Sequence, residues 1–400
     1  MKILHIAPTP FFSDRGCHMR ILGEILELQT MGFNVVLVTY HNGRDIDNLL
    51  IKRITNIPWY NKIEAGPSWH KLYLDLLLLV NAVRIGWINR PDIIHGHLHE
   101  GALIGKAMSL LLSGGKIPVI FDVQGSLTGE LETHGFFNEI KVFRVVFRLM
   151  ERFICKLPDY LVCSSESSTL FIKNKMSVPA RKVMALPDGI FSNYFIPRNS
   201  RGFREQLGIP DGKKIVVYTG ALTSSKGIEY FLEAIPLVLA AFRDVHFLVV
   251  GYPIEDARAQ VRRLKVEHAV SFTGKVDYFE LPKYLSFADV AVDPKLEAGA
   301  EGSGKIINYM GAGLPVVCFD TLNNRALLGS SEYAAKFGDT EDLSRKIVSF
   351  LEDDNLARRV GNTNKEIVEN NFSWAKSGKK LADLYLRLNK PGARGRREKG

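Results

Sequence analysis

Short apolar runs alternate with helical patterns along the first two hundred residues. The strands that we expect there are Lys2–Ala7, Asn34–Tyr40, Asp92–His95, Pro118–Val123 and Tyr160–Ser164. Between the first two, apolar residues at helical spacing predict a helix from about His18 to Met31, closed by Gly32. A regular order of strand, helix and strand predicts a parallel sheet covered by helices.

The same pattern starts again in the second half of the chain. The strands expected there are Ile215–Tyr218, His246–Val250, Val270–Thr273, Val290–Asp293 and Val316–Phe319. Residues 198–213 are polar and basic, as in a linker. We therefore predict an α/β protein with two Rossmann-like, doubly wound domains, residues 1–197 and 214–372, which face a central cleft.

Composition and charge narrow the class of protein. A hydrophobic content of 46% and a charged content of 24% are typical of a soluble globular protein. The formal charge is +9, but residues 390–400 carry five basic residues and one acidic residue, so about +4 lies in a tail expected to be disordered. The remaining charge suits an anionic small substrate or an acidic membrane surface. Because no aromatic and basic platform is present, we expect no nucleic-acid partner.

Targeting signals and cysteines favour a cytoplasmic protein. The N-terminus MKILHIAP leads directly into a strand, without the features of a signal peptide, and the four cysteines are scattered without metal-type spacing. The most apolar stretch, Leu72–Ile88, is interrupted by Asp75, Asn81 and Arg84. Because a membrane span needs about 20 largely uncharged residues, we expect a helix packed on a sheet, or one lying on a membrane surface.

A second amphipathic helix is expected at KVFRVVFRLMER. Its cations Lys141, Arg144, Arg148 and Arg152 recur along one stripe. The stripe is either an ordinary solvent-exposed face or a surface attracted to an anionic bilayer. The second interpretation would place the protein on the cytosolic face of a membrane.

Two helix starts in the second half are candidate anion sites. The strand that ends near Tyr218 is followed by TGALTSSKG, with a tight turn at Gly220 and Lys226 just before a helix. Free amides, the helix dipole and an ammonium group suit a phosphate there, although an ordinary capped turn fits as well. In EGSGKIINYM, Lys305 and Asn308 lie three residues apart on one side of a helix, which suits a phosphate and a ribose hydroxyl.

Several stretches together resemble a known family. TGALTSSKG, VHFLVVG, VSFTGKV, ADVAVDP and EGSGKIINYMGAGLPVV, in this order and spacing, are similar to the retaining glycosyltransferase family 4, also called glycosyl transferases group 1. PDIIHGHLHEGALIG resembles the segment around the family's HxH turn. The resemblance implies a GT-B fold in which the last helix, residues 373–389, crosses back to the first domain.

The resemblance also implies an activity. It implies transfer of a sugar, with retention, from a nucleotide-diphosphate sugar, most often a UDP-sugar or GDP-sugar, to a glycan, lipid-linked or small-molecule acceptor. It implies no bound metal and no cofactor. The donor residues that it assigns are Gly16, Arg20, Gly220, Lys226, Gly274, Lys275, Val276, Ser303, Gly304, Lys305 and Asn308. Gln124, Lys226 and Glu301 are the expected catalytic residues, and His97, Asp122, Gln124 and Ser126 are expected to contact the sugar or the acceptor.

Three positions depart from the family pattern. Ala221 stands where an arginine is common, which leaves Lys226, Lys305 or Arg20 to bind phosphate. Asn308 replaces a glutamate that binds the ribose, and Gln124 replaces a histidine and cannot act as a general base. The alternative is therefore a catalytically silent nucleotide-sugar-binding homologue or scaffold. A GT-B-shaped epimerase or phosphorylase would need cofactor or carboxylate signals that the chain does not show.

The segment HGHLHEG has its own alternatives. Because alternate residues of a strand share a face, His95, His97 and His99 could converge on a metal ion. They could equally line the cleft around His97 or be structural. No carboxylate or cysteine partner is fixed by the spacing, and the family resemblance implies that no metal is bound.

Overall fold

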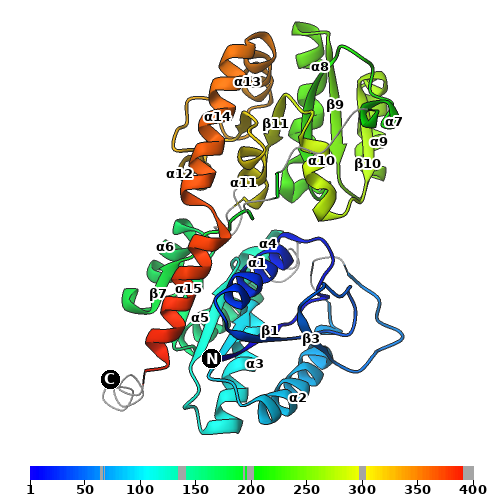
Figure 1. The fold of residues 1–400 in the computed structure, drawn as a ribbon. Coiled ribbons are helices and arrows are strands. Elements are labelled where there is room, and N and C mark those ends of the chain that lie inside the picture. The colour runs from blue at the N-terminus through cyan, green and yellow to red at the C-terminus, as the bar shows by residue number, and fades with distance from the viewer. Residues whose placement is uncertain are drawn as a thin grey trace. The chain divides into compact units, whose positions relative to one another are not determined.

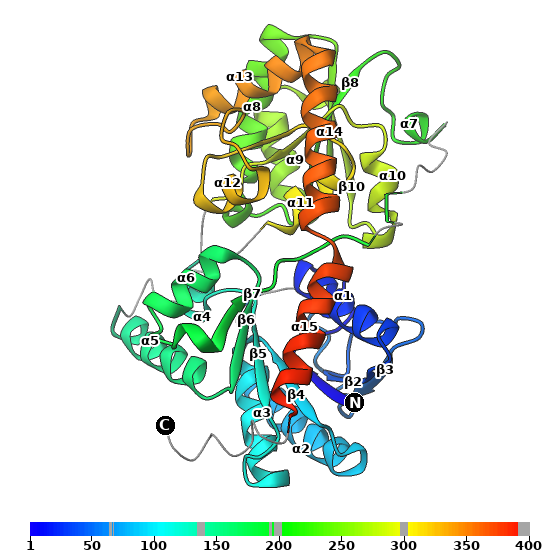
Figure 2. The same ribbon diagram turned by 60° about the vertical axis from the view of Figure 1, so that its left-hand side comes forward.

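The computed structural model describes residues 1–63, 66, 68–133, 141–191, 194–195, 202–296 and 303–390. The chain divides into two compact units, each built on one sheet (Figures 1 and 2). Unit 1 comprises residues 1–188 and the chain from Trp374 onward. Unit 2 comprises the described residues of 189–297 together with Ser303–Ser373. Glu301, one of the expected catalytic residues, and the tail after Lys390 lie outside the described residues.

Unit 1 has a seven-stranded parallel sheet in the order β3-β2-β1-β4-β5-β6-β7. Its strands are β1 Lys2–Ala7, β2 Asn34–Thr39, β3 Leu50–Arg53, β4 Ile93–His97, β5 Val119–Val123, β6 Tyr160–Cys163 and β7 Val183–Ala185. Strands β4, β5 and β6 are buried along their whole length. This burial explains their continuous apolar runs, because a parallel sheet is covered by helices on both faces.

The helices of unit 1 lie on two sides of this sheet. They are α1 Gly16–Thr30, α2 Lys71–Asn89, α3 Leu98–Ser113, α4 Leu127–Thr133, α5 Lys141–Lys156, α6 Glu166–Asn174 and α15 Trp374–Leu388, with a short 3-10 turn at Ala180–Lys182. The connection through α1 runs along the sheet in the opposite direction from those through α2, α3 and α5. Because such crossovers are right-handed, α1 lies on one face, where α15 packs on it, and α2, α3 and α5 lie on the other.

Unit 2 has a five-stranded parallel sheet in the order β10-β9-β8-β11-β12. Its strands are β8 Lys214–Thr219, β9 Val245–Val250, β10 Val270–Gly274, β11 Val290–Asp293 and β12 Val316–Cys318. Alternate residues of β8 feed the two apolar cores on either side of the sheet. Val216 and Tyr218 face one core with Phe231, whereas Ile215 and Val217 face the other with Ile306.

The helices of unit 2 complete these two layers. They are α7 Phe203–Gln206, α8 Ile228–Ala241, α9 Glu255–Arg263, α10 Leu281–Leu285, α11 Gly304–Gly311, α12 Leu322–Leu328, α13 Thr340–Glu352 and α14 Asp354–Asn371, with 3-10 turns at Ser224–Lys226, Glu267–Ala269 and Tyr278–Glu280. Two parallel sheets in two units confirm the predicted fold class.

The division between the units differs from the expected domain boundary. It falls between Asp188 and Gly189 rather than at residue 197. The described part of the expected linker, from Gly202 onward, belongs to unit 2, because Phe203 of α7 is buried there against the rings of Tyr284 and Phe287. Ile209 is also buried in the core of unit 2, with Leu207 packed against it. The polar composition of the segment had hidden these apolar anchors.

Candidate functional site

In unit 2, glycines bring the loops after three strands into contact. A side-chain carbon at Gly251, after β9, would lie 1.8 Å from the carbonyl oxygen of Gly220, after β8. A side-chain carbon at Gly227, before α8, would lie 1.9 Å from the carbonyl oxygen of Pro294, after β11. Gly220 (φ +119°) and Gly227 (φ +70°) also have backbone conformations that favour glycine. Half-buried Lys226 ends the 3-10 turn just before Gly227 and α8, and the close approach of Gly227 to Pro294 holds this turn at the carboxyl end of the sheet.

Lys305 reaches the same end of the sheet but is already paired. Its Nζ lies 2.6 Å from Oδ1 of fully buried Asp293 at the end of β11, and 4.5 Å from the centre of the Tyr218 ring. Ser303, just before α11, donates a hydrogen bond to the same carboxylate. Burial alone would raise the pKa of Asp293, but Lys305 and Ser303 outweigh it and hold the pKa below its ordinary value. The ammonium group is therefore partly neutralised by an acid that the sequence analysis did not assign to the site.

Asn308 is also engaged within unit 2. It is 7% exposed, and its Oδ1 accepts a hydrogen bond from the Tyr278 hydroxyl at 3.0 Å. The hydroxyl of the next residue, Tyr309, accepts a hydrogen bond from the backbone N–H of Thr219 at 2.8 Å. It forms a second hydrogen bond with the Thr219 hydroxyl at 2.9 Å, in which either oxygen can be the donor. The first turns of α11 are thus tied to β8 and to the turn at Tyr278–Glu280.

The segment expected to line the nucleotide base follows β10. Gly274 has φ +74°, and Lys275 is exposed with its Nζ 5.6 Å from the centre of the Tyr252 ring. Val276 is half-buried against the apolar core below α11. The backbone of this turn is therefore fixed by packing at Val276, whereas the Lys275 side chain stays at the surface.

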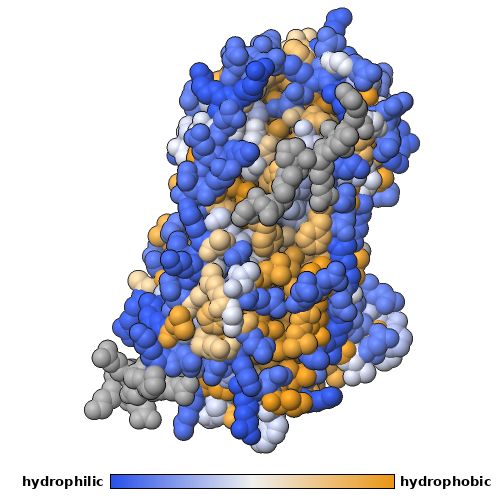
Figure 3. Space-filling model, viewed as in Figure 1, coloured by the Kyte–Doolittle hydropathy of each residue, from blue (hydrophilic) through white to orange (hydrophobic). Residues whose placement is uncertain are grey.

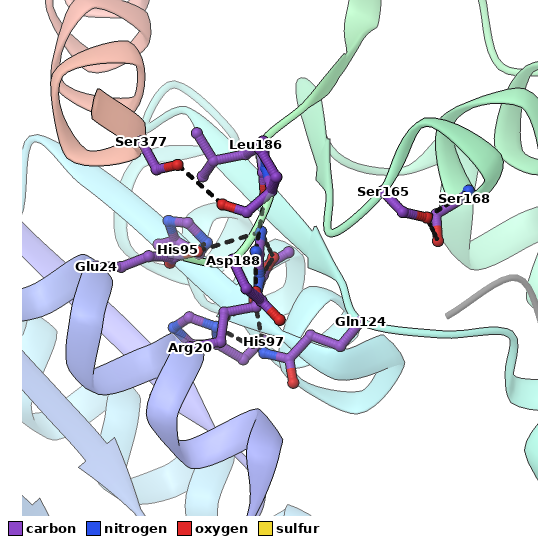
Figure 4. Close-up of polar contacts among 12 residues, drawn as sticks. Arg20, Glu24, His95, His97, Gln124, Ser165, Ser168, Leu186, Asp188 and Ser377 are labelled. Carbon is purple, nitrogen blue, oxygen red and sulfur yellow. Dashed lines mark hydrogen bonds and ion pairs between the residues drawn. The ribbon is translucent and has the colours of Figure 1, made fainter. Parts of the chain in front are cut away.

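In unit 1, Arg20 is buried in a network of carboxylates instead of facing outward. It is 2% exposed, and its Nε donates to Asp122 at 2.8 Å. Its Nη1 donates to the Leu186 carbonyl at 2.7 Å and to Asp188 at 2.8 Å, and its Nη2 lies 3.3 Å from Glu24 (Figure 4). Since the guanidinium is occupied by three carboxylates and a carbonyl, the expected phosphate contact would require these bonds to break.

Three histidines stack beside this network. His95 and His97 of β4 lie 4.7 Å apart between ring centroids, and His5 of β1 lies 4.6 Å from His95. His5 Nδ1 is 2.8 Å from His97 Nε2, and the other His97 nitrogen is 2.9 Å from Asp122 Oδ2. His99 belongs to α3 and instead lies 3.5 Å from Glu151. The three imidazoles of HGHLHEG therefore do not converge, and β1 supplies the third member.

The network could be considered as a metal site. Glu24, His95, His97 and Asp122 offer ligand atoms that all lie within 4.8 Å of one another. However, Arg20 brings a positive charge to two of these four side chains, Asp122 at 2.7 Å and Glu24 at 3.3 Å. Because a second cation there would be repelled by the guanidinium, we interpret the cluster as an ion-pair network.

Burial and the neighbouring charges separate the pKa values in this network. Burial of Asp122 is outweighed by Arg20 and His97, which hold its pKa well below the ordinary value. Burial, together with the charge of Asp122, raises the pKa of Glu24 well above the ordinary value. Burial likewise lowers the pKa of His5 and His95. These shifts favour an ionised Asp122 beside Arg20, next to His5 and His95 in their neutral form.

Gln124 lies at the open end of this network, after β5. It is half-buried, and its Nε2 donates to Asp122 Oδ2 at 2.6 Å and lies 3.5 Å from His97 Nδ1 (Figure 4). Ser126 starts the following turn and accepts from the Gly129 N–H at 3.1 Å. The structure thus brings together His97, Asp122 and Gln124, three of the four residues expected to contact the sugar or the acceptor.

The remaining expected residues are placed by their helices. Gly16 is exposed at the first position of α1, where a side chain would meet nothing within 4 Å. Gly304 is the first residue of α11. Both positions present backbone amides at a helix start.

The sequence analysis missed four members of the two clusters, namely buried His5, Glu24 and Asp293 and half-buried Asp188. His5 and Asp293 could have been found, because a polar residue within or at the end of an otherwise apolar strand signals a buried partner. Glu24 lies four residues after Arg20, a spacing that could have suggested the pair. Asp188 carries no such signal, since Arg20 is distant from it in sequence.

Models of two families match the chain. The model described as Glycosyltransferase Family 4 matches residues 19–192, and the model described as Glycosyl transferases group 1 matches residues 213–353. The first covers most of unit 1 and the second covers most of unit 2.

Individual relatives and a solved structure give the same picture. The chain is 24% identical over 208 residues to a GDP-mannose-dependent monoacylated α-(1-6)-phosphatidylinositol monomannoside mannosyltransferase of Corynebacterium glutamicum, a match that spans 50% of this chain and 55% of that protein. It is 23% identical to UDP-Gal:α-D-GlcNAc-diphosphoundecaprenol α-1,3-galactosyltransferase of Escherichia coli, over 79% of this chain and 80% of that one. The structure of sucrose-phosphate synthase from Thermosynechococcus elongatus superposes with a TM-score of 0.81 at 18% identity, covering 97% of this chain and 98% of that chain.

Proposed function

Because the chain belongs to the glycosyltransferases of group 1 and family 4, we propose that it transfers a sugar, with retention, from a nucleoside-diphosphate sugar to an acceptor hydroxyl without using a bound metal. One observation carries this proposal. Gly220, Ser303 and Lys305 lie together at the carboxyl end of the unit 2 sheet, and Lys226 precedes Gly227, which packs on the loop after β11. Helix starts with nearby ammonium groups suit a diphosphate.

The main role of these residues in the reaction would be to supply fixed positive charge. The leaving nucleoside diphosphate gains negative charge as the bond to the sugar breaks, so preorganised amides and cations lower the barrier. Lys226 and Lys305 are the two lysine candidates, and Lys305 shares its charge with Asp293. Gln124 can orient a hydroxyl by hydrogen bonding but cannot accept a proton from it as a general base.

For the donor, we propose a UDP-sugar or a GDP-sugar. The relatives described above are named for UDP-galactose and for GDP-mannose. For the acceptor, we propose a lipid-linked glycan or headgroup, because the same two relatives are named for a diphosphoundecaprenol-linked sugar and for a phosphatidylinositol mannoside.

Calorimetric titration with UDP, GDP and ADP, without added metal, tests the donor site. One nucleotide should bind selectively, and Lys226→Ala should weaken it by about 1.5–3 kcal/mol, the size of a charge-assisted hydrogen bond. Lys336→Ala is the control, since Lys336 is exposed elsewhere in unit 2. If a folded Lys226→Ala protein bound with unchanged affinity, Lys226 would lose its role.

The second candidate function is a silent nucleotide-sugar-binding homologue. It is favoured by Ala221, by Gln124, and by the engagement of Lys305 and Asn308 with Asp293 and Tyr278. Such a protein would bind a nucleotide but leave the donor intact. Following release of UDP or GDP from a panel of nucleotide sugars, with and without lipid-linked acceptors, separates it from an active transferase.

A further inference from the structure

Helix α2 is apolar on both of its sides. One side is buried in unit 1 by Leu74, Leu78, Ala82, Ile85 and Gly86. The opposite side carries five apolar side chains that are 60–72% exposed, namely Leu72, Leu76, Val80, Trp87 and Ile88. Within the described residues α2 is long and apolar enough to cross a membrane, yet only 28% of its apolar window is buried. The expectation of an ordinary core helix therefore accounts for one side of α2 and leaves the other unexplained.

Helix α5 has a second exposed apolar stripe, bordered by cations. Its exposed apolar side chains are Phe143, Val145, Val146, Leu149, Met150 and Phe153. Arg144, Arg148, Arg152 and Lys156 are exposed beside them, one turn apart. The single acid of α5, Glu151, points into the unit, where it binds the backbone N–H groups of Leu127 and Thr128.

These two helices lie on the same face of the sheet, with α3 between them and in contact with both (Figure 2). Helix α3 adds three exposed leucines, Leu103, Leu110 and Leu111. Figure 3 shows hydrophobic residues exposed over a broad part of unit 1, interrupted by hydrophilic ones. We call the exposed side of α2, α3 and α5 the three-helix face. Single exposed apolar residues are ordinary on a protein surface, whereas a group of this size on neighbouring helices marks an interaction surface.

The charge of the three-helix face has one sign. The acids of its helices are Asp75, Glu100 and Glu151, and each is turned inward: Asp75 accepts from the Tyr40 hydroxyl at 2.6 Å and Glu100 pairs with Lys71 at 3.1 Å. Among the described side chains of these helices, the exposed charges are therefore those of Arg84, Arg144, Arg148, Arg152 and Lys156. Arg144 pairs with exposed Glu132 of α4 at 2.9 Å, which leaves the other four without an acidic partner among the described residues. A surface of apolar side chains and cations matches an anionic lipid surface.

We propose that the three-helix face docks on an anionic lipid bilayer, with the apolar stripes of α2 and α5 in the headgroup region and the arginines on lipid phosphates. Trp69 and Trp87, 79% and 72% exposed at the two ends of α2, fit the preference of tryptophan for membrane interfaces. A second copy of this chain is a poorer occupant, because a symmetric contact would place one cationic face against another. Since the buried stripe holds α2 on the sheet, the helix lies along the bilayer and does not cross it.

Docking on a bilayer would bring the enzyme to a lipid-linked acceptor, and this benefit rests on the proposed function. The binding of the three-helix face to lipid does not depend on that function. Its test needs neither donor nor acceptor. The full chain is floated with vesicles of phosphatidylcholine alone and of equal parts of phosphatidylcholine and phosphatidylglycerol, at low and high salt. We expect binding to the anionic vesicles, reduced about tenfold or more without anionic lipid or at high salt.

Paired variants locate the binding surface. Leu149→Glu with Phe153→Glu, Leu76→Glu with Val80→Glu, and Arg148→Glu with Lys156→Glu should each reduce binding about tenfold or more. The matched controls lie on unit 2: Leu322→Glu with Leu237→Glu for the apolar pairs, and Arg262→Glu with Arg263→Glu for the basic pair, all at exposed positions. A chain ending at Lys390 measures the share of the basic tail and should still bind.

Tryptophan fluorescence gives a second measurement on the same samples. Anionic vesicles should shift the emission to shorter wavelength, brominated lipid should quench it, and Trp69→Phe with Trp87→Phe should remove most of both effects. Of the other two tryptophans, Trp374 is 2% exposed and should not respond, and Trp59, 73% exposed and outside the three helices, gives the response of an exposed tryptophan away from the three-helix face.

Three outcomes would overturn the docking surface. The first is no binding of the wild-type chain to anionic vesicles, and the second is binding that only removal of the tail abolishes. The third is a wild-type dimer, dissociated by Leu149→Glu with Phe153→Glu, that ignores vesicles and so assigns the face to a second copy. Donor binding without vesicle binding would reject this inference alone, and vesicle binding without donor binding would reject the proposed transferase alone.

Discussion

At the scale of single residues, two expected donor cations are neutralised by the protein itself. Lys305 is paired with Asp293, and Arg20 is held by Asp122, Glu24 and Asp188. A buried charge needs a partner, and removing that partner costs more than the pair contributes. The carboxylates that pair with Lys305 and Arg20 therefore determine how much positive charge remains for a ligand, and mutating them tests the site as directly as mutating the cations.

Asp293→Asn should separate the structural from the ligand-binding role of Lys305. Loss of the carboxylate leaves the ammonium group unpaired, so the free energy of unfolding in urea should fall by about 2–4 kcal/mol. If Lys305 reaches the donor phosphates, the freed charge should at the same time tighten nucleotide binding in calorimetry. Asp320→Asn, which breaks a surface pair with Arg325, is the control and should change neither. Equal stability of Asp293→Asn and wild type would contradict the buried pair.

Asp75 predicts how the free energy of unfolding changes with pH. Burial, with the charge of Glu100, raises the pKa of Asp75 to about 7, against an ordinary value of 3.8. The unfolded chain therefore releases this proton first, so the side chain destabilises the fold increasingly as pH rises from about 4 to 7, with no further change above that. Asp75→Asn removes the ionisation. Its stability relative to wild type, from urea unfolding, should rise across this window, and a constant difference would contradict the raised pKa.

At the scale of elements, Glu151 joins two helices across a segment outside the described residues. From α5 its carboxylate accepts the backbone N–H groups of Leu127 at 3.0 Å and Thr128 at 3.2 Å, which are free donors of the first turn of α4. The Thr128 hydroxyl donates to it at 2.5 Å. Helix α4 follows Gln124 and Ser126, so this carboxylate fixes the loop that carries two expected sugar or acceptor contacts.

Glu151→Gln should loosen α4 more than it unfolds the protein. An amide keeps one acceptor but loses the charge, which is worth about 1.5–3 kcal/mol across these hydrogen bonds. Hydrogen exchange should speed up at the amides of Leu127 and Thr128. Glu166→Gln, in the exposed first turn of α6, is the control and should leave exchange in α4 unchanged. Unaltered protection of α4 in Glu151→Gln would show that packing, not the carboxylate, holds this helix.

The elements that the sequence predicts well are those with continuous apolar runs. β1 and β11 have the expected ends, and the other predicted strands of both sheets differ by one or two residues at an end. The edge strands β3 and β7 were missed, because LIKR is half polar and VMA is only three residues long. The candidate residues after the strands lie where a parallel sheet predicts them. Their partners could not be predicted, because Arg20 and Asp188, or His5 and His97, meet through the sheet order and not through sequence spacing.

At the scale of the whole molecule, unit 1 is built from both ends of the chain. Trp374 is 2% exposed and packs on α1, where a side chain at Gly23 would lie 2.2 Å from its ring. Further along α15, the Tyr385 hydroxyl lies 2.5 Å from His95 Nδ1, and Ser377 donates to the Pro187 carbonyl. The last helix therefore completes the core and the buried network of the first unit.

Trp374→Ala should weaken unit 1 selectively. Removing a buried indole costs about 3–5 kcal/mol, so hydrogen exchange in β1 and β4 should accelerate, while exchange in β8 and β9 stays as in wild type. Leu386→Ala, 53% exposed on the same helix, is the control and should change little. Faster exchange in unit 2 alone would contradict the assignment of α15 to unit 1.

Because α15 belongs to unit 1, unit 1 can be completed only after unit 2 has been translated. When the ribosome has made Asp188, the surface of α1 that will receive Trp374 is still uncovered, and residues 189–373 must be translated first. At about 5–20 residues per second this takes on the order of 10–40 s. Unit 2 is fully synthesised before unit 1, so a nascent chain carries an N-terminal unit with an uncovered apolar surface on α1 while the later unit folds.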